Sequence, residues 1–294
     1  MRFIGAAQEL LPYGSDREDR QLWLETRRRG ITASEISIIL GLSKWNSPLS
    51  LFFTKLGHLD ENEGSYRMDL GAYLEPYVLA QFTKMTDAEL EHAGLLASTE
   101  REWQMATPDG LWNLAPIEAK TSVSEDDWGP TGSDQVPVYY RCQLLWQMDV
   151  IGSQVGYICV VFMRSGEPRW YCLDWDGDDI AIMREAALEF IDRLERGIPP
   201  KADGSDASYR ALKQLYPPEE DVTAACGRRM VIQYAASLRR MRNAKDRHQL
   251  ITNKMRQHMG PASRLVDPDG DTVATRRGPK DSLYPSRKLT REDE

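Results

Sequence analysis

The sequence contains few of the patterns that mark structural zinc sites, secreted domains or membrane spans. Four cysteines occur among the 294 residues and no two have Cys-x-x-Cys spacing, so neither a zinc site nor a disulfide framework is expected. We expect these cysteines to be buried as small hydrophobic side chains. No apolar run approaches the ~18 residues of a membrane helix, and Met1 to Leu11 lack the charged and apolar regions of a secretory leader. These absences predict a globular, cytoplasmic protein that has no contact with membrane.

The net charge of −8 argues at first against nucleic acid as a ligand. The charge is unevenly distributed, however, because residues 1–200 hold 18 basic and 32 acidic side chains, whereas residues 201–294 hold 19 basic and 13 acidic ones. Within the second part, Arg228 to Arg256 carries nine basic residues against the single Asp246. Such a block suits a phosphate backbone, and a solvated helix surface explains it equally well.

The succession of apolar patterns and turn signals predicts two domains. Helical and β-rich segments alternate over residues 1–200, which predicts an α/β domain with a central mixed sheet flanked by helices. Residues 201–294 are predicted to form a basic helical extension with a small β-hairpin from Arg264 to Arg276 and a disordered tail from Lys280. Helices are expected over Arg17–Arg29, Tyr66–Met85, Val138–Val150, Ile180–Arg196 and Thr223–Met259, the last as a coiled-coil arm or with a break near Asn243.

The segment from Thr107 to Thr121 carries the chemistry around which the chain is organised. Pro108-Asp109-Gly110 is typical of a tight turn, and the residues that follow read as a short strand. Because side chains alternate along a strand, Glu118 and Lys120 are expected on one face, which Asp109 can approach from the turn. Two carboxylates beside an amine suit a hard divalent metal, with Lys120 orienting or activating a water. Taken alone, the Glu118 and Lys120 pair is also typical of a surface salt bridge.

Three further positions fall where a shared site needs them. Glu75 lies near the centre of a predicted helix, directly before a proline that is expected to kink it. Gln143 shares one helical stripe with Tyr140, Leu144 and Gln147. Ser34 lies in the first turn of a helix that Thr32-x-x-Glu35 is predicted to cap, and a helix N-terminus is suited to an anion. A solvated glutamate, a buried glutamine and a capped helix without a ligand are the plainer interpretations.

Five motifs follow one another along the chain: Ile31-Thr32-Ala33-Ser34-Glu35, Gly71-x-x-Leu74-Glu75-Pro76, Thr107-Pro108-Asp109-Gly110, Glu118-Ala119-Lys120 and Tyr139-Tyr140-Arg141-Cys142-Gln143. In this order they resemble the motifs of the YqaJ-like viral recombinase group, which belongs to the PD-(D/E)XK nuclease superfamily and is similar to the exonuclease of phage lambda. The resemblance covers about residues 20–195 and implies the PD-(D/E)XK core fold.

Residue by residue, the resemblance implies a metal site and a site for a DNA end. The family's metal-binding carboxylates match Asp109 and Glu118, with the Ala119 backbone carbonyl and Glu75 as further members. Its catalytic lysine matches Lys120 and its active-site glutamine matches Gln143. The residues that hold a 5′-terminal phosphate in lambda-type enzymes match Ser34 and an arginine of the run 27–29, with Arg27 and Arg28 as the candidates, because this chain is one residue shorter between the run and Ser34. Pro116 departs from the family pattern and is expected at a strand start or edge.

The resemblance further implies a 5′-to-3′ double-strand DNA exonuclease that uses one or two Mg²⁺ or Mn²⁺ ions and leaves 3′ overhangs for homologous recombination. Double-stranded DNA ends, a single-strand annealing protein and further copies of the chain are the expected partners. No iron–sulfur cluster is expected, because the four cysteines do not bracket the core as they do in helicase-linked relatives. A metal-dependent endonuclease and a non-catalytic DNA-binding scaffold remain as alternatives.

Overall fold

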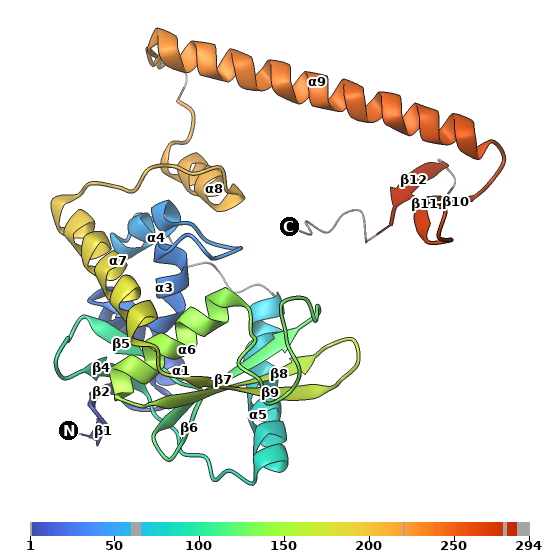
Figure 1. Ribbon diagram of the computed structural model, residues 1–294. Helices are drawn as coiled ribbons and strands as arrows, with labels where there is room; N and C mark the ends of the chain where they lie inside the picture. The colour runs from blue at the N-terminus through green and yellow to red at the C-terminus, as the bar shows by residue number, and fades with distance from the viewer. Residues whose placement is uncertain (1, 60–65, 220, 279–280, 287–294) are drawn as a thin grey trace. The chain divides into compact units, whose positions relative to one another are not determined.

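The computed structural model describes residues 2–59, 66–219, 221–278 and 281–286 (Figure 1). These residues divide into two compact units, the first extending to Pro218 and the second beginning after it. The first unit contains the two larger sheets and most of the helices, and the second contains one long helix and a small sheet.

Two mixed sheets form the framework of the first unit. One has the strand order β1-β2-β4-β5-β3, in which β3 runs parallel to β5 and the other neighbours are antiparallel. Its strands are β1 (Phe3–Ile4), β2 (Ala7–Leu11), β3 (Ile31–Thr32), β4 (Leu95–Ser98) and β5 (Gln104–Ala106). The predicted mixed α/β architecture is confirmed, and the strands before residue 107 pair with the N-terminal strands and form a sheet of their own.

The second sheet has the order β6-β7-β8-β9, and β7 runs parallel to β8 while the outer pairs are antiparallel. Its strands are β6 (Gly110–Trp112), β7 (Ala115–Ser122), β8 (Val155–Phe162) and β9 (Pro168–Asp174). Pairing of β7 with β8 begins only at Ile117, so Pro116, which has no N–H to donate, precedes that ladder. The predicted position of Pro116 at a strand start is confirmed.

Eight helices of the first unit are described: α1 (Ser15–Glu18), α2 (Arg20–Arg28), α3 (Ala33–Ile39), α4 (Pro48–Lys55), α5 (Tyr66–Thr86), α6 (Val138–Ile151), α7 (Gly177–Arg196) and α8 (Asp206–Leu215). The predicted helix over Arg17–Arg29 is divided in two, because the Asp19 side chain accepts the Leu22 N–H at 3.0 Å and caps α2 as a separate helix. The other helices predicted in this unit are confirmed to within a few residues at their ends.

The second sheet is covered by a helix on each face. Ile158, Val160 and Phe162 of β8 pack in the core cluster that contains α6. The alternating residues Cys159 and Val161 pack in a second cluster, with side chains of α5. The crossover helix α6 also contacts β4 and β5 of the first sheet, so this helix connects both sheets.

A buried tryptophan fixes the position of α6. Trp146 is fully buried and donates through its indole N–H to the carbonyls of Ile31 and Met105 at 3.3 and 3.2 Å. These carbonyls belong to β3 and β5 of the first sheet. The first sheet thereby sets where the polar residues of α6 meet the second sheet.

The boundary between the units lies after Pro218 rather than at residue 200. The helix α8 packs against α4, and the Ser208 hydroxyl makes a buried hydrogen bond of 2.9 Å with the Ser47 hydroxyl at the start of α4. This interaction corrects the assignment of residues 201–218 to the C-terminal extension. A helix that composition alone assigned to a linker region belongs to the first unit.

The second unit contains α9 (Arg228–Met259) and an antiparallel sheet of β10 (Arg264–Val266), β11 (Thr272–Arg277) and β12 (Ser282–Pro285). The helix is continuous, so the alternative of a break near Asn243 is wrong. The strand β12 corrects the prediction of disorder from Lys280, while residues 287–294 lie outside the described part.

Two expectations about composition are tested by the described residues. Cys226 is exposed and Cys172 is partly exposed, against the prediction that the cysteines are buried, whereas Cys142 and Cys159 are buried. Among the described residues no helix is long and apolar enough to span a membrane.

Candidate active site

The turn before β6 and the middle of β7 bring two carboxylates and a lysine together. Asp109 is held in the turn by its N–H, which donates to the Ile117 carbonyl at 3.1 Å, and its Oδ2 accepts the Ala119 N–H at 2.7 Å. The Glu118 side chain is 2% exposed, and the Lys120 ammonium forms an ion pair with its Oε1. Glu118 and Lys120 thus lie on the same face of β7, as strand alternation predicted.

The helix α6 supplies two amides to the Glu118 carboxylate. Gln143 donates through Nε2 to Oε1 at 2.5 Å, and Gln147 donates through Nε2 to Oε2 at 2.6 Å. Gln147 was not among the predicted site residues, although its spacing of one helical turn from Gln143 signals the same face. It is fully buried, and its Oε1 has no hydrogen-bond partner among the described residues. A buried carbonyl oxygen without a donor beside a carboxylate is compatible with a bound water or cation.

Burial and mutual repulsion make two carboxyl groups of this site, those of Asp109 and Glu75, costly to ionise. Burial raises the pKa of Asp109 well above its ordinary value, and the charge of Glu118 raises it further, against the smaller opposing effects of Lys120 and the Ala119 N–H. Burial also raises the pKa of Glu75 on α5, again with help from the charge of Glu118. Negative charge on Asp109 or Glu75 is therefore poorly solvated, and a bound cation would stabilise it.

The ammonium of Lys120 responds to the same charges in the opposite direction. Its burial lowers the pKa, but the attraction of Glu118 and then of Asp109 outweighs the burial, so that the pKa is raised above its ordinary value. Lys120 is therefore a firmly protonated cation in this arrangement. One ammonium offsets only part of the charge of three carboxyl groups.

Oxygen donors, burial and mutual repulsion fit a hard divalent cation, because such an ion prefers carboxylate and carbonyl oxygens and relieves the repulsion between them. Among the described residues, no three His, Cys, Asp or Glu side chains converge closely enough to enclose a metal ion by themselves. Asp109 and Glu118 would therefore need further oxygens, from water, from a backbone carbonyl such as that of Ala119, or from a phosphate. Open coordination of this kind is typical of Mg²⁺ sites that act on phosphates.

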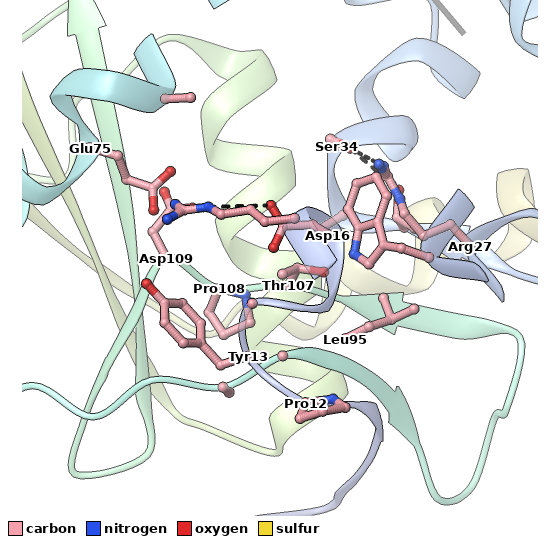
Figure 2. A pocket seen from close by; sticks show the side chains of 18 of the residues that line it. Pro12, Tyr13, Asp16, Arg27, Ser34, Glu75, Leu95, Thr107, Pro108 and Asp109 are labelled. Carbon is pink, nitrogen blue, oxygen red and sulfur yellow. Dashed lines mark hydrogen bonds and ion pairs between the residues drawn. The ribbon is translucent and has the colours of Figure 1, made fainter. Parts of the chain in front are cut away.

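A cavity of about 280 Å³ joins this acidic site to a cationic one. Arg27 at the end of α2 donates through Nη2 to the hydroxyls of Thr32 and Ser34, at 3.1 and 3.2 Å. Figure 2 shows Glu75 and Asp109 near each other at one end of the cavity and Arg27 with Ser34 at the other. Arg28 does not line this cavity, so of the two candidate arginines the structure places Arg27 beside Ser34.

Two residues of the short helix α1 enter the same cavity and were missed by the sequence analysis. Asp16 and Arg17 line it, and the charge of Arg17 opposes the rise in the pKa of Glu75. Their approach depends on how the turn at Asp19 folds α1 against α2, which no local pattern predicts. The site residues come from seven separate segments, namely α1, α2, α3, α5, the turn before β6, β7 and α6.

Comparisons with known proteins find a family model and several proteins that are similar to this chain. Residues 22–154 match the model of the YqaJ-like viral recombinase domain. The uncharacterized protein YqaJ of Bacillus subtilis (strain 168) is 27% identical over 256 residues, which cover 83% of this chain and 79% of that protein.

Among solved structures, the chain is similar to an alkaline exonuclease, LHK-Exo, from Laribacter hongkongensis, with a TM-score of 0.50 and 22% identity over 60% of this chain and 94% of that one. The same values hold for LHK-Exo in complex with dAMP. At this level of identity the likeness concerns the fold alone, and it agrees with the predicted α/β fold class. Residues 22–154, which match the YqaJ-like viral recombinase domain, include Arg27, Ser34, Glu75, Asp109, Glu118, Lys120 and Gln143.

Proposed function

We propose that this chain is a metal-dependent 5′-to-3′ exonuclease of double-stranded DNA, which leaves 3′ single-strand overhangs for phage-type homologous recombination. The observation that carries the proposal is the shared cavity, in which Arg27 and Ser34 lie at one end and Glu75 and Asp109 at the other. A cation for a terminal phosphate beside a site for hydrolysis is the arrangement that an enzyme acting from a DNA end requires. The fold shared with an alkaline exonuclease supports the same class of reaction.

Asp109 and Glu118 would hold one or two Mg²⁺ or Mn²⁺ ions, with Glu75 and the Ala119 carbonyl as further donors. Such ions, when bound, polarise the scissile phosphate and stabilise the attacking and leaving oxygens of an in-line displacement. Gln143 and Gln147 keep both oxygens of Glu118 oriented through their hydrogen bonds. Positioned ligands reduce the reorganisation that the reaction otherwise requires.

Lys120 acts in this scheme as a cation. Because its pKa is raised, Lys120 stays protonated while it is paired with Glu118 and does not serve as the base. It instead places positive charge where the phosphate becomes more negative and orients the attacking water by donating a hydrogen bond. The carboxyl groups of Asp109 and Glu75 have raised pKa values, so in the absence of metal they retain protons to higher pH than ordinary carboxyl groups do.

End recognition follows from the two hydroxyls and the guanidinium at the other end of the cavity. A 5′-terminal phosphate bound by Arg27 and Ser34 gains charge-assisted hydrogen bonds. The first phosphodiester bond of that strand would then lie toward the carboxylates, so hydrolysis would begin at the 5′ end and proceed 5′ to 3′. The dAMP complex of the LHK-Exo structure agrees with a nuclease fold that accepts a mononucleotide.

Assembly and location complete the proposal. Oligomerisation of this chain around duplex DNA would keep the enzyme on its substrate through many cycles, and a single-strand annealing protein would take up the exposed 3′ strand. The oligomer and the annealing protein would both act on DNA in the cytoplasm of the cell that contains this DNA.

The proposal is tested by digesting linear duplex DNA, labelled separately at each 5′ and 3′ end, with Mg²⁺ and with EDTA, beside covalently closed plasmid. Early release of the 5′ label as a mononucleotide, only with Mg²⁺ and with the plasmid intact, is the expected result. Cleavage of the plasmid would favour an endonuclease of the same fold. Absence of cleavage with either Mg²⁺ or Mn²⁺ would favour a non-catalytic DNA-binding scaffold and contradict the proposal.

A further inference from the structure

A row of aromatic rings runs from the catalytic lysine to the protein surface and has no role in the hydrolysis scheme. The Lys120 ammonium lies 5.3 Å from the centre of the Tyr140 ring. The Tyr139 ring follows, 4.4 Å from Tyr140, and the Trp45 ring is 5.3 Å from Tyr139. Tyr139 and Tyr140 begin α6, whereas Trp45 lies in the loop between α3 and α4. Two distant segments thus contribute to one continuous series of rings.

The inner ring is fixed and the outer ring is open to solvent. Tyr140 packs 5.7 Å from the buried Trp128, whereas Trp45 is 54% exposed. The Ser43 hydroxyl accepts the N–H groups of Trp45 and Asn46 at 3.2 Å and holds the loop in place. A large ring that is held in an ordered loop and exposed to water adds little to the core, so core packing does not explain its position.

A positive charge accompanies the exposed end of the row. The Lys44 ammonium lies 5.3 Å from the centre of the Tyr139 ring, and its side chain is 61% exposed. Its ion pair with Asp127 is 3.8 Å long and is open to solvent, so this pair is weak and a phosphate can replace it. Flat rings next to a lysine are the combination that binds single-stranded nucleic acid, because every base has a π-face and every nucleotide a phosphate.

The row is separate from the pocket that we assign to the terminal phosphate. Trp45, Tyr139 and Tyr140 do not line the cavity that contains Arg27 and Ser34, and they reach the catalytic site through Lys120. A strand whose first phosphate is at Arg27 and whose scissile phosphate is at Lys120 continues past Lys120. The aromatic row is therefore the surface that its next nucleotides meet.

We propose that Trp45 and Tyr139 form a stacking site for unpaired nucleobases on the 3′ side of the scissile phosphate, in the strand that is being hydrolysed. The site takes unpaired bases because the faces of paired bases are already covered by their neighbours in the duplex. Stacking there holds the frayed end open and keeps the next phosphate close to Lys120. This inference rests on the exonuclease function that we propose for the chain.

The test measures the binding of end-frayed duplex DNA by fluorescence anisotropy in EDTA, with the label at the far end. Trp45→Ala and Tyr139→Ala are each expected to weaken binding about tenfold, the usual effect of removing one base-stacking ring. Trp45→Phe and Tyr139→Phe keep a ring and are expected to retain most of the affinity. Phe3→Ala, which removes an exposed aromatic side chain from β1, serves as the matched control and is expected to bind as the wild type does.

A double-mutant cycle separates stacking from a general disturbance of the fold. Duplexes that carry one abasic nucleotide at successive positions from the 5′ end remove individual bases and leave the phosphates in place. At the stacked position the abasic DNA is expected to bind the wild type about tenfold more weakly. The Trp45→Ala variant should show no further weakening there, because both changes remove the same stacking interaction.

Two outcomes would overturn the inference. Unchanged binding by both alanine variants would exclude a stacking site, and fully additive effects at every abasic position would show that Trp45 acts through the fold and touches no base. Failure of the wild-type protein to degrade duplex DNA is a different result, which contradicts the proposed exonuclease function. Near-wild-type digestion together with unchanged binding by the variants contradicts only the stacking site.

Discussion

Replacing Asp109 by asparagine separates the charge of the site from its shape. Asparagine keeps an oxygen that can accept the Ala119 N–H, which Asp109 accepts at 2.7 Å, and it removes the negative charge. Because burial and Glu118 raise the pKa of Asp109, its ionised form costs the metal-free folded protein free energy at neutral pH. We therefore expect Asp109→Asn to abolish hydrolysis and to stabilise the metal-free protein.

The expected gain in the free energy of unfolding of the Asp109→Asn variant is limited. Neutralising a destabilising functional residue commonly raises the free energy of unfolding by roughly 0.5–2 kcal/mol, and the removal of a charged acceptor at Ala119 offsets part of this. We expect a net gain of about 1 kcal/mol in urea unfolding in EDTA. Mg²⁺ reverses the order, because an ion at a hundredfold excess over its dissociation constant stabilises the wild type by about 2.7 kcal/mol, whereas the variant lacks a ligand.

The same difference depends on pH in a defined direction. The folded-state pKa of Asp109 lies above its ordinary value of 3.8, so the folded state binds the proton more tightly than the unfolded chain does. The stabilisation of the metal-free wild type by this proton is therefore complete below the ordinary pKa and is lost as pH rises through the raised one. The asparagine variant lacks this pH dependence, and the two unfolding curves converge in acid.

A buried aspartate outside the site, Asp149, provides a control with the opposite sign. Asp149 is 7% exposed and accepts hydrogen bonds from Arg184 at 2.6 and 2.9 Å and from Gln104 at 2.7 Å. Asp149→Asn removes one partner of a buried ion pair and is expected to destabilise the protein by about 3 kcal/mol, with or without Mg²⁺. A lower stability of Asp109→Asn in EDTA, or equal stabilisation of wild type and variant by Mg²⁺, would refute the reasoning.

Three further predictions concern the cations. Lys120→Ala is expected to bind end-labelled duplex in gel-shift assays much as the wild type does and to turn over at least about a hundredfold more slowly; near-wild-type cleavage contradicts its role. Arg27→Ala is expected to be about tenfold slower on 5′-phosphorylated ends and to digest phosphorylated and unphosphorylated ends equally, so a retained preference contradicts end recognition by Arg27. Arg239, Arg240 and Arg247 are exposed arginines of α9, and the third prediction replaces all three by glutamine. The slope of log DNA affinity against log salt concentration should then fall by about 0.9 for each phosphate that is no longer neutralised. An unchanged slope indicates that these arginines form a solvated surface.

The parts of the site that the sequence predicts are those set by local geometry. Strand alternation is sufficient to place Glu118 and Lys120 on one face, and the Pro-Asp-Gly turn is sufficient to bring Asp109 beside them. Helical spacing directs Gln143 toward the same strand. Each of these inferences requires only a few consecutive residues.

The parts that the sequence does not predict depend on packing between distant segments. Nothing near Arg17 indicates that it enters a cavity beside Glu75, because the approach depends on the fold of α1. The division of the strands into two sheets depends on which partner each strand edge finds, and short strands such as β3 and β5 carry little signal of their own. Gln147 lies between these two cases. The sequence shows that it is one helical turn from Gln143, but its hydrogen bond to Glu118 depends on burial that the sequence does not show.

The acidic composition of the first 200 residues becomes consistent with DNA as substrate once the positive groups are located. Repulsion between an acidic surface and phosphates weakens binding along the length of a duplex, whereas Arg27, Lys120 and Lys44 concentrate positive charge around the cavity and the aromatic row. A strand end that reaches these groups gains interactions that the middle of a duplex cannot make. With the function that we propose, the excess of 32 acidic over 18 basic side chains, a net charge of −14 over these residues, would favour ends over internal sites, which is the selectivity that an exonuclease needs.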